Sequence, residues 1–197
     1  MKHLFFALAA LVAAASPASA QSTAWSVDKS HSKLGFSVTH LVISEVDGHF
    51  GDYTVAVKSD KADFSDARVD VIVKTTSVDT DEPKRDEHLR SEDFFSSAKF
   101  PDMTFKGKQM RKTGDTSYKL DGELTIRDVT KPVTLDVTFV GTAKDPWGNM
   151  KAGFKLSGKI NRSAFGLTWN KALEAGGWLV SEDVTIEGSF QLARSAG

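Results

Sequence analysis

The chain has 197 residues, of which 40% are hydrophobic and 26% charged, and its 25 basic and 26 acidic side chains leave a net charge of −1. This near-neutral balance argues against nucleic-acid binding, which needs a concentrated basic face. The chain has no cysteine, which excludes disulfides, a cysteine nucleophile and a lipid-modified cysteine. Its length is sufficient for one domain with a sizeable core.

Residues 1–20 have the pattern of a cleavable signal peptide. A short polar start precedes an apolar run over residues 4–15, and Ala18-Ser19-Ala20 fits the small-x-small rule for cleavage. The apolar run is too short to span a bilayer, and no second segment is long enough to do so. We therefore expect a signal peptide over 1–20, a mature domain over 21–197, and a periplasmic or secreted protein without a transmembrane segment.

Apolar and polar residues alternate along most of the mature chain, which predicts strands with one buried and one solvated face. The strand candidates are 32–40, 45–58, 67–78, 102–111, 116–127, 132–142, 150–161 and 179–193. Short turn sequences at 113–115, 128–132 and 145–149 link several of them as hairpins. The pattern predicts an all-β fold, an eight-stranded antiparallel up-and-down barrel whose closure removes exposed edges. A two-sheet sandwich is the alternative.

Several alternating segments have a glycine in the middle of their apolar face. These glycines are Gly107, Gly122, Gly158 and Gly188. Glycine removes volume from the place that a core side chain would fill, which suggests a closed sheet with space for a ligand. Glycine also lets strands bend at barrel corners. Both interpretations stay open at this point.

Two segments interrupt the strand pattern. Residues 80–95 are mostly helix formers, with Asp81 as the expected N-cap and Pro83 in the first turn, and they end in Phe94-Phe95. Residues 162–178 carry aromatic side chains among glycines. We expect a short charged helix near one mouth of the barrel. Each segment either lies across the opening or is an ordinary crossover that plugs the end of the core.

Short motifs along the mature chain resemble those of one known family. In chain order they are Trp25-Ser26-Val27-Asp28-Lys29-Ser30-His31-Ser32, Phe36-Ser37-Val38-Thr39-His40-Leu41, Val46-Asp47-Gly48-His49-Phe50, Ser77-Val78-Asp79-Thr80, Arg85-Asp86-Glu87-His88-Leu89-Arg90-Ser91-Glu92-Asp93-Phe94-Phe95, Phe100-Pro101, Gly122-Glu123-Leu124-Thr125-Ile126-Arg127 and Asn161-Arg162-Ser163-Ala164-Phe165-Gly166-Leu167. Their order and spacing resemble the YceI-like family of bacterial periplasmic polyisoprenoid-binding proteins. The resemblance implies a lipocalin-like barrel that holds a long apolar chain, such as a polyprenyl compound or a quinone tail, as its ligand. It transfers no catalytic residue, and it alone supplies the expectation of a homodimer, because members of the family often pair.

The ligand-binding candidates are inward-facing residues of the strands and aromatic residues near the mouths, because such pockets are mostly apolar with a few polar groups. The lumen candidates are Phe36, Val38, His40, Tyr118, Leu124, Ile126, Val137, Phe139, Phe154, Leu156 and Phe190. The mouth candidates are Phe94, Phe95, Trp147, Phe165, Trp169 and Trp178. Arg85, His88 and Arg90 either meet a polar or anionic head group or belong to a solvated helix face, and we prefer the second interpretation.

The polar residues show no catalytic or metal-binding signature. The histidines lack the spacing of metal ligands, there is no nucleophile elbow, and no acidic pair stands in an apolar setting. Asn161-Arg162-Ser163 is interpreted as a turn motif in which Arg162 pairs with a carboxylate. The expected function is non-enzymatic binding, sequestration or transport of an isoprenoid lipid in the periplasm, without a cofactor or metal. The alternatives are an enzyme acting on such a lipid and a stress-response or interaction barrel without a ligand.

Overall fold

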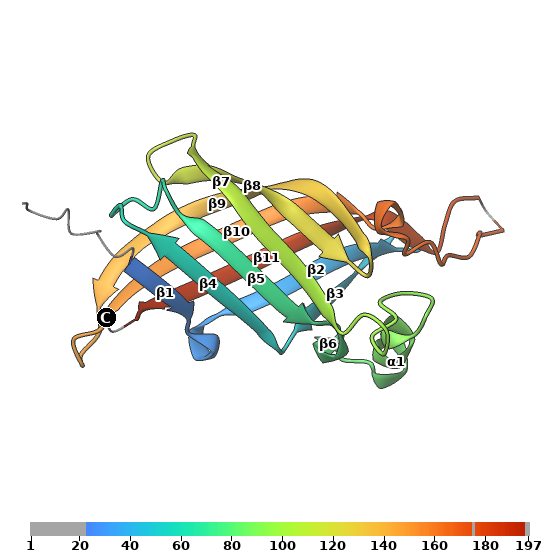
Figure 1. Cartoon of the computed structure of the whole chain (residues 1–197). Coiled ribbons are helices and arrows are strands. Elements are labelled where there is room, and N and C mark those ends of the chain that lie inside the picture. Colours follow the sequence, from blue (N-terminus) through green and yellow to red (C-terminus); the bar gives the residue numbers. More distant parts are fainter. Residues whose placement is uncertain (1–22, 175, 196–197) are drawn as a thin grey trace, which may run out of the picture.

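The computed structural model describes residues 23–174 and 176–195, so the predicted signal peptide lies outside the described residues. A short helix accompanies a sheet that closes on itself (Figure 1). The strands are β1 (Thr23–Val27), β2 (Lys33–His40), β3 (Ser44–Phe50), β4 (Tyr53–Ser59), β5 (Arg68–Lys74), β6 (Val78–Asp79), β7 (Asp102–Lys112), β8 (Ser117–Ile126), β9 (Val129–Lys144), β10 (Met150–Asn161) and β11 (Val180–Arg194). The helix is α1 (Pro83–Arg90), and single 3₁₀ turns are η1 (Lys29–His31), η2 (Thr75–Ser77) and η3 (Ser163–Phe165). Within the described residues, no helix has the length and apolar character needed to cross a bilayer.

Hydrogen bonding between the first and last strands closes the barrel. Strand β1 pairs with β4, with Trp25 opposite Val57, and also with β11, with Val27 opposite Leu192. From β4 the antiparallel order continues through β5, β7, β8, β9 and β10 back to β11. The described residues therefore form the predicted eight-stranded antiparallel barrel, and the closed ring excludes the two-sheet sandwich.

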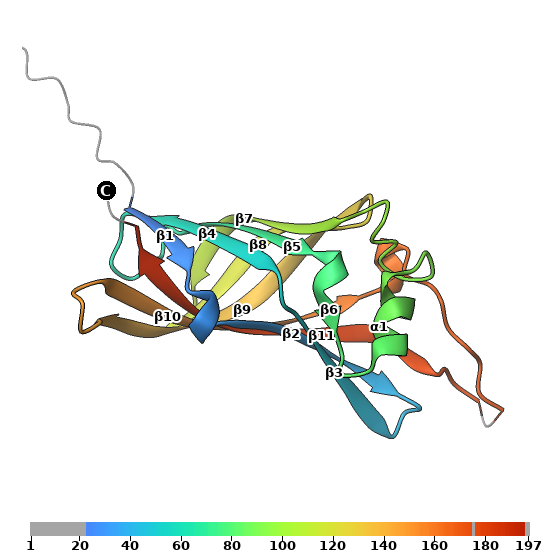
Figure 2. The same ribbon diagram turned by 90° about the horizontal axis from the view of Figure 1, so that it is seen from below.

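Two of the predicted strands are divided, and one strand was not predicted. Candidate 45–58 forms β3 and β4, which are separated at Gly51-Asp52, and candidate 67–78 forms β5 and β6, which are separated by η2. Strand β1 precedes the first candidate and was missed. Because β2 pairs with both β11 and β3, and β3 pairs with β6, the sheet extends beyond the ring at one end. Figure 2 shows helix α1 beside this extension.

Helix α1 is shorter than the segment 80–95 predicted from the sequence, because it begins later and ends earlier. Its N-cap is Glu82 and not Asp81, because the Glu82 carboxylate accepts a hydrogen bond from the Arg85 N–H at 2.7 Å. The helix ends at Arg90, and the chain then turns back, with the Phe95 N–H donating to the Leu89 carbonyl at 2.9 Å. This turn buries both Phe94 and Phe95 against the barrel.

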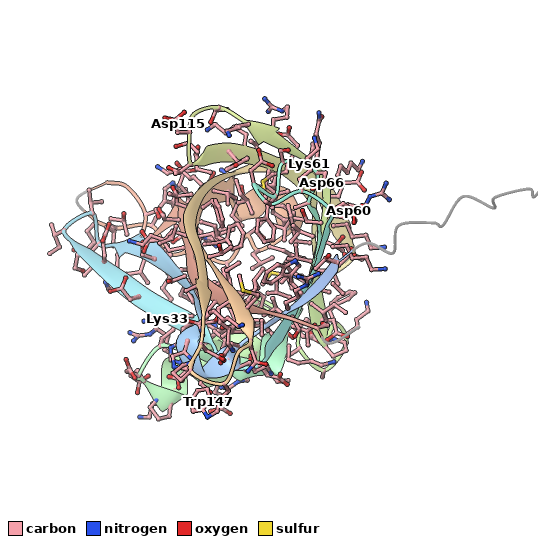
Figure 3. The ribbon with its side chains drawn as sticks, turned by 90° about the vertical axis from the view of Figure 1, so that its left-hand side faces the viewer. Lys33, Asp60, Lys61, Asp66, Asp115 and Trp147 are labelled. Atoms are coloured by element: carbon pink, nitrogen blue, oxygen red, sulfur yellow. The ribbon has the colours of Figure 1, made fainter. Side chains whose placement is uncertain are left out.

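The end of the barrel opposite α1 is closed by aromatic side chains. The loop between β4 and β5 places the Phe64 ring 5.2 Å from Trp25, 5.4 Å from Phe139 and 5.0 Å from Phe154, measured between ring centroids. The Tyr118 hydroxyl donates to the neighbouring Asp63 carbonyl at 2.7 Å and holds the loop in place. Figure 3 views the barrel from this end, with interior side chains filling its centre. We call Trp25, Phe64, Phe139 and Phe154 the aromatic plug.

Candidate ligand-binding cavity

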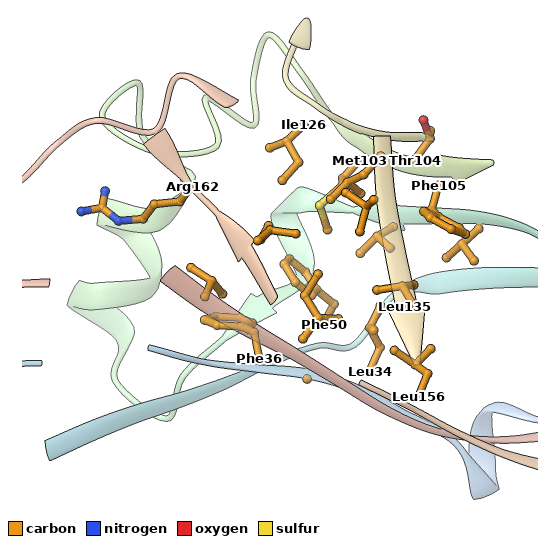
Figure 4. Close-up of a pocket in the computed structure, with 18 of the residues that line it drawn as sticks. Leu34, Phe36, Phe50, Met103, Thr104, Phe105, Ile126, Leu135, Leu156 and Arg162 are labelled. Atoms are coloured by element: carbon orange, nitrogen blue, oxygen red, sulfur yellow. The ribbon is translucent and has the colours of Figure 1, made fainter. Parts of the chain in front are cut away.

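An apolar cavity of about 360 Å³ occupies the barrel interior (Figure 4). This volume lies within the roughly 300–1,000 Å³ that is usual for small-molecule sites. The lining at the plug end, such as Phe64 and Leu192, is buried, whereas Phe36, Val38 and Trp169 near α1 are partly exposed. The cavity therefore opens toward α1.

Most of the residues proposed from the sequence as ligand contacts line this cavity. They are Phe36, Val38, His40, Phe94, Phe95, Leu124, Ile126, Val137, Phe154, Leu156, Trp169 and Phe190. The strand residues among them come from β2, β8, β9, β10 and β11, so the topology brings together side chains from distant parts of the chain. Their contact with a ligand stays a prediction.

The other proposed contacts lie outside the cavity lining. Tyr118 and Phe139 belong to the closed end, and Phe165 is buried within η3. Trp147 is 84% exposed in the turn between β9 and β10, at the plug end and not at the mouth (Figure 3), and Trp178 is 56% exposed. Alternation along a strand shows which face a residue occupies but not how far along the barrel axis it lies.

Some lining residues were missed by sequence reasoning. Those on β4 and β5 are Val55, Val57, Val69, Val71 and Val73. They alternate with outward-facing residues inside two predicted strands, but Ala56 and Ile72 among these are apolar, so the period-two pattern identifies the inward face only in part. Phe64 lies in a loop, where alternation provides no signal.

Large side chains cover the inward glycines. A Cβ atom placed on Gly122 would collide with the Phe105 ring, and one placed on Gly158 would collide with Leu135. Gly188 is covered by Phe190 in the same way. The interpretation that these glycines themselves leave empty space is therefore wrong. They allow a ring or a leucine to lie flat against the wall, and the cavity is the volume that remains between the flattened side chains.

The polar lining residues gather toward the α1 end. The Arg85 Nε–H donates to the Thr80 hydroxyl at 2.8 Å, and this hydroxyl donates to the buried Asp86 carboxylate at 2.6 Å. The His88 ring packs edge-on against Trp169, with 4.7 Å between centroids, and its Nε2 lies 2.8 Å from Asp93. Polar side chains on and beside α1 thus lie at one opening of an apolar cavity. Among the described residues, no group of three or more His, Asp or Glu side chains is placed to hold a metal ion.

Arg162 is buried and connects the segments around the mouth. Its guanidinium donates to the carbonyls of Leu167 at 2.7 Å, Trp169 at 2.9 Å and Ser181 at 2.9 Å. Burial lowers the pKa of this guanidinium from its usual value. The acceptors are carbonyl oxygens, so the expectation that Arg162 pairs with a carboxylate was wrong. Figure 4 shows Arg162 set apart from the apolar side chains, with its guanidinium pointing away from them.

The fold and the cavity define a closed β-barrel with an apolar interior that is accessible from one end. A family model described as the YceI-like domain matches residues 25–192, and the chain belongs to this family. The resemblance identified from the short motifs is thereby confirmed. The Staphylococcus aureus UPF0312 protein SAB2563 is 37% identical over 174 residues, which cover 88% of this chain and 99% of that protein.

Solved structures of similar proteins have the same barrel. The Campylobacter jejuni YCEI protein is 37% identical with a TM-score of 0.68, and the match covers 87% of this chain and 97% of that one. Burkholderia cenocepacia BcnA is 23% identical with a TM-score of 0.72, covering 86% and 99% of the two chains. A polyisoprenoid binding domain from Saccharophagus degradans is 14% identical with a TM-score of 0.60, covering 87% and 98%. At these low identities, the matches to BcnA and to the polyisoprenoid binding domain show a shared fold and no more.

Proposed function

We propose that this protein binds a long-chain isoprenoid lipid, such as a polyprenyl compound or a quinone, with the chain inside the barrel. The observation that carries the proposal is the distribution of side chains along the cavity, which is apolar from the plug to the mouth and polar only toward α1. An amphiphile with one polar head and one long apolar tail matches this distribution. The barrel shared with a domain described as polyisoprenoid binding supports the same ligand class.

The free energy for binding comes from removing the tail from water. Each buried methylene contributes roughly 0.8 kcal/mol, so even part of a prenyl chain supplies substantial affinity. The head group then lies near His40, Arg85 and His88, where it keeps access to solvent. We further propose that binding is non-enzymatic and serves sequestration or transport in the periplasm, in line with the signal-like pattern of residues 1–20. A homodimer stays a prediction that sedimentation will test.

The test is the lipid content of natively purified protein. An organic extract analysed by mass spectrometry should contain a long apolar amphiphile, and delipidated protein should take up added polyprenol or ubiquinone without altering it. Recovery of a chemically modified lipid would favour an enzyme instead. An extract without lipid, together with no uptake of either compound, would contradict the proposal.

A pair of tryptophan variants makes this test specific to the cavity. Leu156 is partly buried and lines the cavity, whereas the adjacent Lys155 is exposed on the outer face of the same strand. We expect Leu156→Trp to reduce lipid occupancy strongly because the indole fills the tail volume. Lys155→Trp should leave occupancy unchanged.

A further inference from the structure

The turn between β2 and β3 exposes consecutive apolar side chains. Leu41 is 38% exposed, Val42 72% and Ile43 85%. Isolated apolar residues on a surface are ordinary, but a contiguous group at the tip of a projecting hairpin marks a contact site. Figure 2 shows the β2–β3 hairpin projecting from the end of the barrel that carries α1.

The backbone of this turn is unfavourable for the residues that occupy it. Leu41 has φ +53° and Val42 has φ +66°, and the Ile43 N–H donates to the His40 carbonyl at 3.2 Å. Two positive φ angles in the centre of a hairpin turn favour Asn-Gly, and a positive φ is an outlier for a β-branched residue. Both solvation and backbone geometry would therefore be improved by Asn-Gly at these positions. Apolar residues in a strained, exposed turn point to a contact that requires them.

A tryptophan stands next to this turn. The Leu41 N–H donates to the Leu179 carbonyl at 2.9 Å, which ties the hairpin to the segment that carries the exposed Trp178. We call Leu41, Val42, Ile43 and Trp178 the apolar rim. Tryptophan is enriched where proteins meet the interfacial layer of a membrane.

The cavity lining continues up to the apolar rim. Along β2, Phe36, Val38 and His40 line the cavity, and His40 directly precedes Leu41. From the other side, Leu179 and Val180 line it and directly follow Trp178. A lipid tail can thus pass between the rim and the interior while remaining in contact with largely apolar side chains.

We propose that the apolar rim inserts into the surface of a lipid bilayer and places the mouth of the cavity against it. This proposal rests on the proposed lipid binding. It adds that the apolar rim is the surface through which the lipid passes between the bilayer and the cavity. A stable protein–protein interface usually needs about 20–30 residues from each partner, far more than one hairpin tip supplies. A bilayer accepts a narrow apolar tip, because interfacial insertion reaches only about 5–10 Å below the surface.

The charges near the rim indicate whether the bilayer that it contacts should be anionic or zwitterionic. Exposed Glu45 and Asp47 lie on β3, and exposed Glu182 and Asp183 lie on β11, where Asp183 pairs with Lys159 at 3.7 Å. The segment before β11 adds one exposed cation, Lys171, and one exposed anion, Glu174. Because these elements provide no cationic surplus, anionic lipids would not strengthen binding in the way they do for polybasic surfaces. We therefore expect binding to zwitterionic phosphatidylcholine vesicles with little dependence on salt.

The experiment measures vesicle binding and stability of the same variants. Protein expressed from the full coding sequence is purified, its N-terminus is determined by mass spectrometry, and co-sedimentation with phosphatidylcholine vesicles is measured. Leu41→Asn combined with Val42→Gly should raise the urea midpoint, because it supplies the sequence that the turn favours. It should also weaken vesicle partitioning by about tenfold, because binding strength scales with buried apolar area. Val140→Asn is the matched control, because Val140 is 63% exposed on β9 outside the rim, and it should not change partitioning.

Each outcome supports or overturns the proposal. A more stable double variant with weakened partitioning supports insertion and excludes misfolding as the cause. Equal partitioning of wild type and double variant, or no vesicle binding by wild type, overturns it. A wild-type dimer that the double variant dissociates, without vesicle binding, also overturns it and assigns the rim to a second copy of the chain.

Uptake of polyprenol separates this proposal from the proposed function. From detergent micelles, wild type and double variant should take up polyprenol equally, whereas from vesicles the double variant should be slower. If neither protein takes up polyprenol from micelles, lipid binding itself fails. Equal uptake rates from vesicles, alongside normal uptake from micelles, reject only the role of the rim.

Discussion

The phenyl ring of Phe105 lies over Gly122, in the space that a side chain at position 122 would occupy. The two residues belong to paired strands, because Phe105 stands opposite Leu124 and Gly107 stands opposite Gly122 in the β7–β8 ladder. The glycine lets the ring lie against the barrel wall and not across the lumen. The width of the cavity at this point thus depends on the contact between Gly122 and the Phe105 ring, and not on the glycine alone.

Replacing these glycines with alanine should destabilise the protein to different degrees. At Gly122 the added Cβ would meet the Phe105 ring and also the Lys106 backbone oxygen at 2.7 Å, which cannot move easily. At Gly158 it would collide only with the end of the flexible Leu135 side chain. We expect Gly122→Ala to cost about 1–3 kcal/mol of unfolding free energy and Gly158→Ala less, as measured by urea denaturation.

Gly51→Ala is the control, because its Cβ would have only the Ser77 carbonyl within 4.0 Å. Lipid occupancy should fall in Gly122→Ala because the Phe105 ring is pushed into the cavity. Similar unfolding free energies for the Gly51 and Gly122 variants would show that the ring adjusts at little cost.

Trp169 should control how fast a bound lipid leaves. Its ring is partly exposed at the mouth and packs against Phe94, with 5.4 Å between centroids, and against His88. We expect Trp169→Ala to speed lipid release several-fold while the barrel stays folded, as measured by transfer of a fluorescent polyprenyl analogue to acceptor vesicles. Trp147→Ala, at the opposite end, should leave release unchanged, and equal rates in both variants would contradict a gating role for Trp169.

Asp28 should make stability depend on pH in acid. Its carboxylate lies 3.1 Å from the Lys151 ammonium and 3.2 Å from His31, and it accepts a hydrogen bond from the Gln191 amide at 3.1 Å. These contacts, that with Lys151 foremost, lower its pKa from 3.8 to about 2. Because the folded-state pKa is depressed, the stabilisation is complete above about pH 4 and is lost as the pH falls toward 2.

The variant Asp28→Asn should therefore be less stable than wild type at pH 7 by about 1–2 kcal/mol, a value reduced from the full pKa shift to allow for partial solvent screening. The difference should shrink in urea melts below pH 4. Asp136→Asn is the control, because Asp136 forms an exposed ion pair with Lys119 at 2.6 Å, and such pairs contribute only about 0–1 kcal/mol. If wild type and Asp28→Asn differ in unfolding free energy as much at pH 2 as at pH 7, the charge of Asp28 is not the cause of the difference.

The strands were predictable because their signal is local. Residues of β8 such as Leu120 and Leu124 alternate with polar neighbours, so both the strand and its buried face follow from period two. Strand β1 was missed because it is only five residues long and separated from β2 by η1. Depth along the barrel axis was not predictable either, since Phe154 lines the cavity whereas its partner in the ladder, Phe139, belongs only to the plug.

The role of Arg162 depended on contacts that no local pattern encodes. An arginine in a turn is usually solvated, but here the chain folds back so that carbonyls from positions 167–181 surround the guanidinium. The same limit applies to Phe64, whose ring is buried by strands far from it in sequence.

Arg162→Lys should loosen the mouth although it keeps the positive charge. Lysine cannot reproduce the planar fork that donates to Leu167, Trp169 and Ser181, so buried carbonyls lose their donors. We expect a loss of about 1–3 kcal/mol of unfolding free energy, with faster amide hydrogen exchange concentrated in residues 163–181.

Arg127→Lys is the matched control for this arginine. Arg127 also donates to a carbonyl of the same segment, that of Gly166 at 3.3 Å, but this contact is exposed and water can replace it. If fixing the mouth by hydrogen bonds is the function of Arg162, only Arg162→Lys should speed both hydrogen exchange and lipid release. If its charge alone were important, the lysine would preserve both rates, and unchanged exchange in 163–181 would contradict the hydrogen-bonding role.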